Sequence, residues 1–89
     1  MNEEPLEIVL YGRKKCHLCD EVELAIRCLA EEFPLRLQLV DIERDDKLHE
    51  EMMLEIPVVA IDGEVVFRSV THVVTLEELR EEFLKRSVG

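Results

Sequence analysis

The chain has 89 residues, of which 47% are hydrophobic and 36% charged, and its formal net charge is −10 at pH 7. This composition predicts one folded domain over residues 1–89, because a chain of this length can just bury a core of its own. The strong negative charge disfavours nucleic acid and anionic membrane surfaces as partners.

The N-terminal stretch and the cysteine count indicate where the protein acts. The stretch MNEEPLEIVLYG is acidic and lacks the long apolar segment of a secretory signal. The apolar runs are far too short to span a membrane. Three cysteines are an odd number for a secreted disulfide-bonded domain but are common in a reducing compartment. We therefore expect a cytoplasmic protein.

The first half of the chain predicts a strand, a helix and a second strand. LEIVLY at 6–11 is a short apolar run bounded by Pro5 and Gly12, typical of a buried strand. Apolar residues then recur at helical spacing until Pro34 ends the helix; they are Leu18, Val22, Ala25, Ile26, Leu29 and Phe33. LRLQLVDI at 35–42 predicts the second strand, and the short connections imply that the two strands are parallel.

The second half predicts a helix, two strands and a helix. Asp45 or Asp46 caps a short helix. The Asp-Gly pair at 62–63 separates two apolar runs, which predicts a two-residue hairpin of type I′. Thr75 and Glu78 form a capping box that begins the last helix. This order of elements predicts an α/β protein with a four-stranded mixed sheet flanked by helices.

Two cysteines in KKCHLCDE lie where the first strand passes into the first helix. Cys16 falls at the helix N-terminus, where unpaired backbone N–H groups favour an anion. Basic residues crowd the same place; they are Arg13, Lys14, Lys15 and His17. Such surroundings lower the pKa of a thiol and favour the reactive thiolate. We expect Cys19, one turn further on, to be more buried and close enough to form a disulfide with Cys16.

The cysteine spacing also fits half of a metal site or two ordinary core thiols. A zinc site needs further ligands, and the candidates form no second closely spaced pair; they are Cys28, His17, His49 and His72. Cys28 lies about half a turn round the helix axis from Cys19, so it should not share a site with the pair. Core thiols would leave the helix-edge position and the basic cluster unexplained. Cys28, Met52 and Met53 are predicted to be packing residues, and the pattern implies no metal or organic cofactor.

The chain resembles a thioredoxin-fold protein of the glutaredoxin-like type, over nearly its whole length. The resemblance rests on the element order, on CHLC after the first strand and on EIP at the start of the third strand. It implies that Cys16 attacks a substrate disulfide, that Cys19 resolves the mixed disulfide, and that Pro57 is a cis-proline beside the pair. Ile56 would then offer its backbone to an extended substrate segment.

Other positions separate the chain from typical glutaredoxins. These carry C-P-Y-C and a Gly-Gly turn that helps to hold glutathione, whereas this chain has CHLC, similar to a small bacterial subgroup, and RSVTHVVT at 68–75. The residues beside the cysteines, Lys14, His17 and Leu18, are further candidates for substrate binding. The sequence indicates no role for His72.

The resemblance implies a monomeric thiol–disulfide oxidoreductase of cell redox homeostasis and electron transport. Its substrate would be a protein disulfide or a small disulfide, with glutathione or a thioredoxin-type protein as a candidate reductant. The alternative is a non-catalytic binding module of the same fold, or a zinc or iron–sulfur site between two chains.

Overall fold

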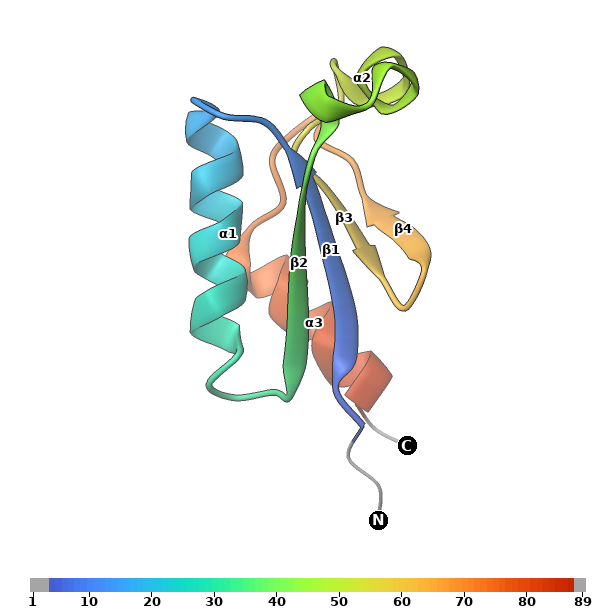
Figure 1. Cartoon of the computed structure of the whole chain (residues 1–89). Helices are drawn as coiled ribbons and strands as arrows, with labels where there is room; N and C mark the ends of the chain where they lie inside the picture. Colours follow the sequence, from blue (N-terminus) through green and yellow to red (C-terminus); the bar gives the residue numbers. More distant parts are fainter. Residues whose placement is uncertain (1–3, 88–89) are drawn as a thin grey trace.

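A computed structural model describes residues 4–87 (Figure 1). The elements are β1 (Leu6–Gly12), α1 (His17–Leu29), β2 (Leu35–Asp41), the 3₁₀ helix η1 (Ile42–Arg44), α2 (Asp46–Met52), β3 (Val58–Ile61), β4 (Glu64–Phe67) and α3 (Leu76–Ser87). This order confirms the predicted fold class. Within the described residues no helix is both long and apolar enough to cross a membrane.

The four strands form one mixed sheet in the order β2-β1-β3-β4. β1 and β2 are parallel, β1 and β3 are antiparallel, and β3 and β4 form the predicted hairpin. Asp62 and Gly63 both have positive φ, at 50° and 87°, as a two-residue turn of type I′ requires. The parallel pair and the hairpin are therefore both confirmed.

The main core lies between the sheet and the two long helices. Apolar residues of α1 and α3 bury three side chains of β1, Leu6, Ile8 and Leu10. In the same core, Phe33, which follows α1, meets Phe83 of α3 edge to face, with ring centroids 5.8 Å apart. Tyr11 belongs to a smaller cluster with α2. Since successive residues of a strand point to opposite faces, α2 covers the other face of the sheet, at the end where α1 begins (Figure 1).

Both predicted helix caps are present. The Glu78 N–H donates to Thr75 Oγ1 over 3.2 Å, and the Thr75 N–H donates to Glu78 Oε1 over 2.9 Å, which completes the capping box. Of the two candidates for the cap of α2, the chain uses Asp45. Its carboxylate accepts the N–H groups of Lys47 and Leu48.

Three expectations about packing and one about the end of a helix were wrong. Leu18 is 45% exposed, because the buried face of α1 begins one residue later, at Cys19. Phe33 is buried but follows the helix, which ends at Leu29. Cys28 is exposed on α1, since the buried face of that helix is formed by other positions. Met53 is also exposed; Met52 alone of that pair is buried.

Candidate functional site

Cys16 and Cys19 lie at the end of the sheet where β1 stops. The chain turns after Gly12, with Lys15 at a φ of 59°, and Cys16 is the N-cap residue of α1. The two cysteines form a disulfide, with their Cα atoms 5.2 Å apart. Cys16 is half-buried and Cys19 is 5% exposed, so Cys19 is the more buried of the two, as predicted.

The start of α1 supplies hydrogen bonds to Cys16. The Cys19 N–H donates to Cys16 Sγ over 3.1 Å, and the Asp20 N–H donates to the Cys16 carbonyl over 3.0 Å. Free N–H groups and the helix dipole favour negative charge at a helix N-terminus. The Cys16 sulfur therefore lies where a helix end favours negative charge.

The basic cluster is partly neutralised by acids. Arg13 lies 3.8 Å from Glu43, and His17 lies 3.7 Å from Glu21 with 91% of its side chain exposed. Lys14 and Lys15 are exposed and have no ion-pair partner among residues 4–87. The predicted binding residues Lys14, His17 and Leu18 therefore all lie on the surface around Cys16.

The Ile56–Pro57 bond is cis, as predicted, and Pro57 is buried. Val58 pairs with Tyr11 of β1, so Pro57 lies at the same end of the sheet as Gly12. The Ile56 N–H already donates to the Met52 carbonyl over 3.1 Å. The Ile56 N–H is therefore not free to pair with an added strand.

The segment after β4 holds the Pro57 turn in place. Ser69 Oγ donates to the Pro57 carbonyl over 2.7 Å, and the Ser69 N–H donates to the Glu55 carbonyl over 2.9 Å. Arg68 forms an ion pair with Glu55. Ser69 could not be identified from the sequence, because nothing in RSVTHVVT marks its partner twelve residues earlier.

Gly12 is a second residue whose role the sequence did not indicate. A Cβ atom at this position would lie 3.0 Å from Cys19 Sγ and 3.1 Å from Cys19 Cβ. Glycine thus lets the start of α1 approach the end of β1 closely. The available signal was a glycine at the end of a strand, four residues before Cys16.

A pocket of about 250 Å³ opens beside Cys19, between α1 and β2. Its walls include the apolar side chains of Leu10, Leu39 and Val40, and Gly12 also borders it. Cys19 is one of the residues that line this pocket, so open space borders the buried cysteine.

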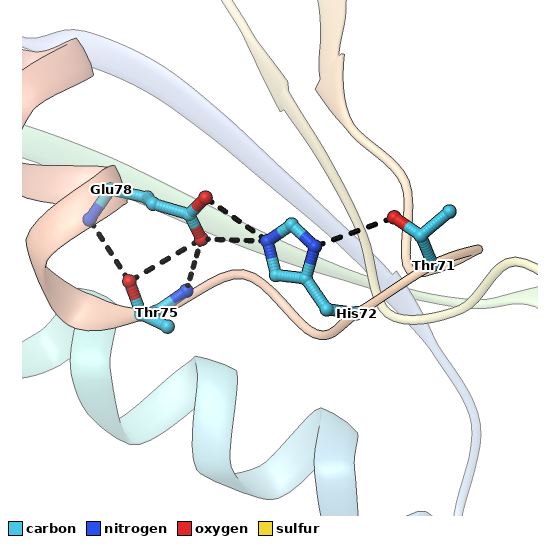
Figure 2. A network of polar contacts seen from close by, with 4 residues as sticks. All are labelled: Thr71, His72, Thr75 and Glu78. Carbon is cyan, nitrogen blue, oxygen red and sulfur yellow. Dashed lines mark hydrogen bonds and ion pairs between the residues drawn. The ribbon is translucent and has the colours of Figure 1, made fainter.

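His72 has partners that the sequence did not indicate. Figure 2 shows its ring between Thr71 and Glu78, with Nε2 3.0 Å from Glu78 Oε2 and Nδ1 3.4 Å from Thr71 Oγ1. The Thr75 backbone N–H and then the His72 ring lower the pKa of Glu78. This contact ties the segment after β4 to the start of α3.

Comparisons with known proteins agree with this architecture. A family model described as glutaredoxin-like domain (DUF836) matches residues 7–86. An NMR structure of a Nitrosomonas europaea protein has 23% identity and a TM-score of 0.75, covering 93% of this chain and 99% of its own. No curated protein matches the sequence.

Two thioredoxin structures are also similar. A mutant thioredoxin from Halobacterium salinarum has 17% identity and a TM-score of 0.70, over 94% of this chain and 76% of its own. Thioredoxin 1 from Thermosipho africanus has 18% identity and a TM-score of 0.64, over 93% of this chain and 99% of its own. At these identities the likeness shows the fold alone, which is the thioredoxin fold.

Proposed function

The chain belongs to the glutaredoxin-like domain family (DUF836), and on that premise we propose that it is a thiol–disulfide oxidoreductase acting through Cys16 and Cys19. One observation carries the proposal. The half-buried Cys16 caps α1 and accepts the Cys19 N–H at its sulfur, while Cys19 is buried behind it. This arrangement suits an accessible nucleophile with a resolving thiol one turn away.

The reduced protein would transfer two electrons to a disulfide in two exchange steps. The Cys16 thiolate attacks one sulfur of the substrate, a mixed disulfide forms, and the other substrate sulfur leaves as a thiolate that takes up a proton. Cys19 then loses its proton and attacks the Cys16 sulfur. The second substrate thiol leaves, and the Cys16–Cys19 disulfide remains.

The surface around Cys16 supports a protein disulfide as the substrate. Exposed apolar side chains come from three segments near the site. Leu18 is two residues after Cys16, Met53 and Leu54 precede the Pro57 turn, and Val70 follows Ser69. Such a rim favours contact with an extended apolar segment rather than with a small charged tripeptide such as glutathione.

We extend the proposal to a monomer in the cytoplasm that takes part in redox homeostasis. The dithiol form would be regenerated by glutathione or by a thioredoxin-type protein. A cytoplasmic role is supported by the odd number of cysteines, which a reducing compartment tolerates.

Trapping of the mixed disulfide tests the assigned roles. Cys19→Ser should accumulate a mixed disulfide on Cys16 when incubated with a cytosolic extract under non-reducing conditions, because no thiol remains to resolve it. Cys16→Ser should trap much less, and Cys28→Ser should behave like the parent. Mass spectrometry identifies the attached protein and the cysteine that carries it.

Other outcomes would contradict the proposal. Equal trapping by both single variants would rule out the assigned roles of Cys16 and Cys19. Trapping by neither variant would favour the non-catalytic binding module. If the purified parent contains zinc by metal analysis or shows the absorption of an iron–sulfur cluster, and both single variants lose it, the result would favour a site shared between two chains.

A further inference from the structure

We propose that Gly12 sets the redox poise of the cysteine pair: its missing side chain leaves room for Cys19 Sγ in the disulfide and so makes the dithiol a stronger reductant. This inference rests on the proposed function, because it concerns the equilibrium of the same pair. Gly12 is a positioning residue in this account, since it acts through Cys19 and touches no substrate.

Space, and not backbone conformation, explains the glycine at position 12. The φ of Gly12 is not positive, so an L side chain would not strain its backbone. A Cβ there would instead meet Cys19 Sγ at 3.0 Å and Cys19 Cβ at 3.1 Å. Ordinary contacts between nonbonded heavy atoms are about 3.5–4.0 Å, so both neighbours would have to move.

The two redox forms differ in how far Cys19 can move. In the disulfide, the sulfur is bonded to Cys16 and cannot turn away from position 12. In the dithiol, the side chain can rotate about its Cα–Cβ bond, and the pocket of about 250 Å³ that it lines offers the room. An alanine at position 12 therefore disfavours the disulfide more than the dithiol. The contact with Cys19 Cβ remains in both forms and affects both.

The consequence concerns the reaction of the dithiol with oxidised glutathione. One molecule of the dithiol and one of oxidised glutathione give the Cys16–Cys19 disulfide and two molecules of reduced glutathione. If alanine destabilises the disulfide, the equilibrium constant of this reaction falls. The pair then gives up its electrons less readily, and its reduction potential becomes less negative. Glycine at position 12 thus favours reduction of a substrate disulfide over oxidation of a substrate dithiol.

The test is the equilibrium of Gly12→Ala with glutathione buffers, read by thiol labelling and mass spectrometry. We expect the equilibrium constant to fall about tenfold, which is about 30 mV for a two-electron couple. Gly63→Ala is the matched control. Gly63 has a φ of 87° and no atom within 4 Å of an added Cβ, so alanine there strains the backbone without touching the sulfurs. It should lower stability in both redox forms and leave the potential unchanged.

A second experiment separates an effect on the disulfide from a general loss of stability. The effect of Gly12→Ala on urea unfolding is measured in the oxidised parent and again in a Cys16→Ser chain, where Cys19 keeps its sulfur but the Cys16–Cys19 disulfide cannot form. A larger loss of stability in the oxidised chain supports the inference. An equal loss in both, a parental potential for Gly12→Ala, or failure of Gly12→Ala to fold in either chain overturns it. These equilibria need no turnover, so failure of the proposed activity would show separately in the trapping experiment.

Discussion

Replacing Ser69 by alanine tests the contact that holds the Pro57 turn at the end of the sheet. The half-buried hydroxyl donates to the Pro57 carbonyl over 2.7 Å. A hydrogen bond of this kind contributes about 1 kcal/mol net to the free energy of unfolding. For a domain of this size, 1 kcal/mol corresponds to about 4–8 °C in the unfolding midpoint. We expect the unfolding midpoint of Ser69→Ala to be lower by about 4–8 °C.

The same substitution should also affect exchange with substrate. Pro57 and Ile56 are predicted to contact the substrate segment, so a looser turn should slow formation of the mixed disulfide severalfold. The glutathione equilibrium of the cysteine pair should not change, because the side-chain contact of Ser69 is with Pro57 and with neither sulfur. Circular dichroism measures the midpoint, and rapid-quench mass spectrometry measures the exchange rate.

Ser87→Ala is the matched control for this experiment. Ser87 is exposed at the end of α3, so the same loss of a hydroxyl should change neither measurement. Ser69→Thr keeps the hydroxyl and should recover part of the lost stability. A Ser69→Ala chain with the parental midpoint and exchange rate would refute the role given to this contact.

Three further predictions concern the thiols, the start of α3 and the core. In the reduced protein, Cys16 should react with iodoacetamide faster than the exposed Cys28, because only Cys16 has a helix N-terminus beside its sulfur; mass mapping that finds label first on Cys28 would contradict this. The Thr75 N–H and the His72 ring lower the Glu78 pKa, so the stability that this carboxylate adds is present above its usual value of 4.5 and is lost as the pH falls through its folded value. Glu78→Gln should therefore be less stable than the parent near neutral pH, and urea unfolding should show the gap closing as the pH falls below the usual carboxyl pKa of 4.5; a gap that stays constant would be evidence against it. Phe83→Ala should lose about 3–5 kcal/mol in urea unfolding, because Phe83 is fully buried; a loss below about 1 kcal/mol would show that the core repacks.

Features carried by neighbouring residues could be predicted from the sequence. The Asp62-Gly63 turn and the capping box of Thr75 and Glu78 each depend on a few adjacent side chains, and the structure has both. The position of Cys16 at a helix start followed from one strand and one helical pattern. Local rules were sufficient here, because each feature satisfies backbone groups within four residues of itself.

Contacts between distant segments could not be predicted in this way. The pairing of Arg13 with Glu43 and of Ser69 with Pro57 depends on how the strands are ordered in the sheet. The exposure of Leu18 and Cys28 depends on where the sheet ends and which side of α1 it covers. Helical spacing shows that one face is apolar, but it does not show how far along the helix that face is covered.

The reactivity proposed for Cys16 has two sources that differ in how firmly the fold holds them. Lys14 and Lys15 are exposed, and salt screens their charges over about 8–10 Å, so they contribute weakly at physiological ionic strength. The Cys19 N–H is held by the first turn of α1 at 3.1 Å from Cys16 Sγ, and the buried Cys19 side chain anchors that turn against β1. We therefore expect the contribution of this backbone amide to a thiolate on Cys16 to depend less on salt concentration than that of the two lysines. Since the missing side chain of Gly12 lets that turn approach β1 closely, we infer that the same glycine supports both the proposed nucleophile and its disulfide with Cys19.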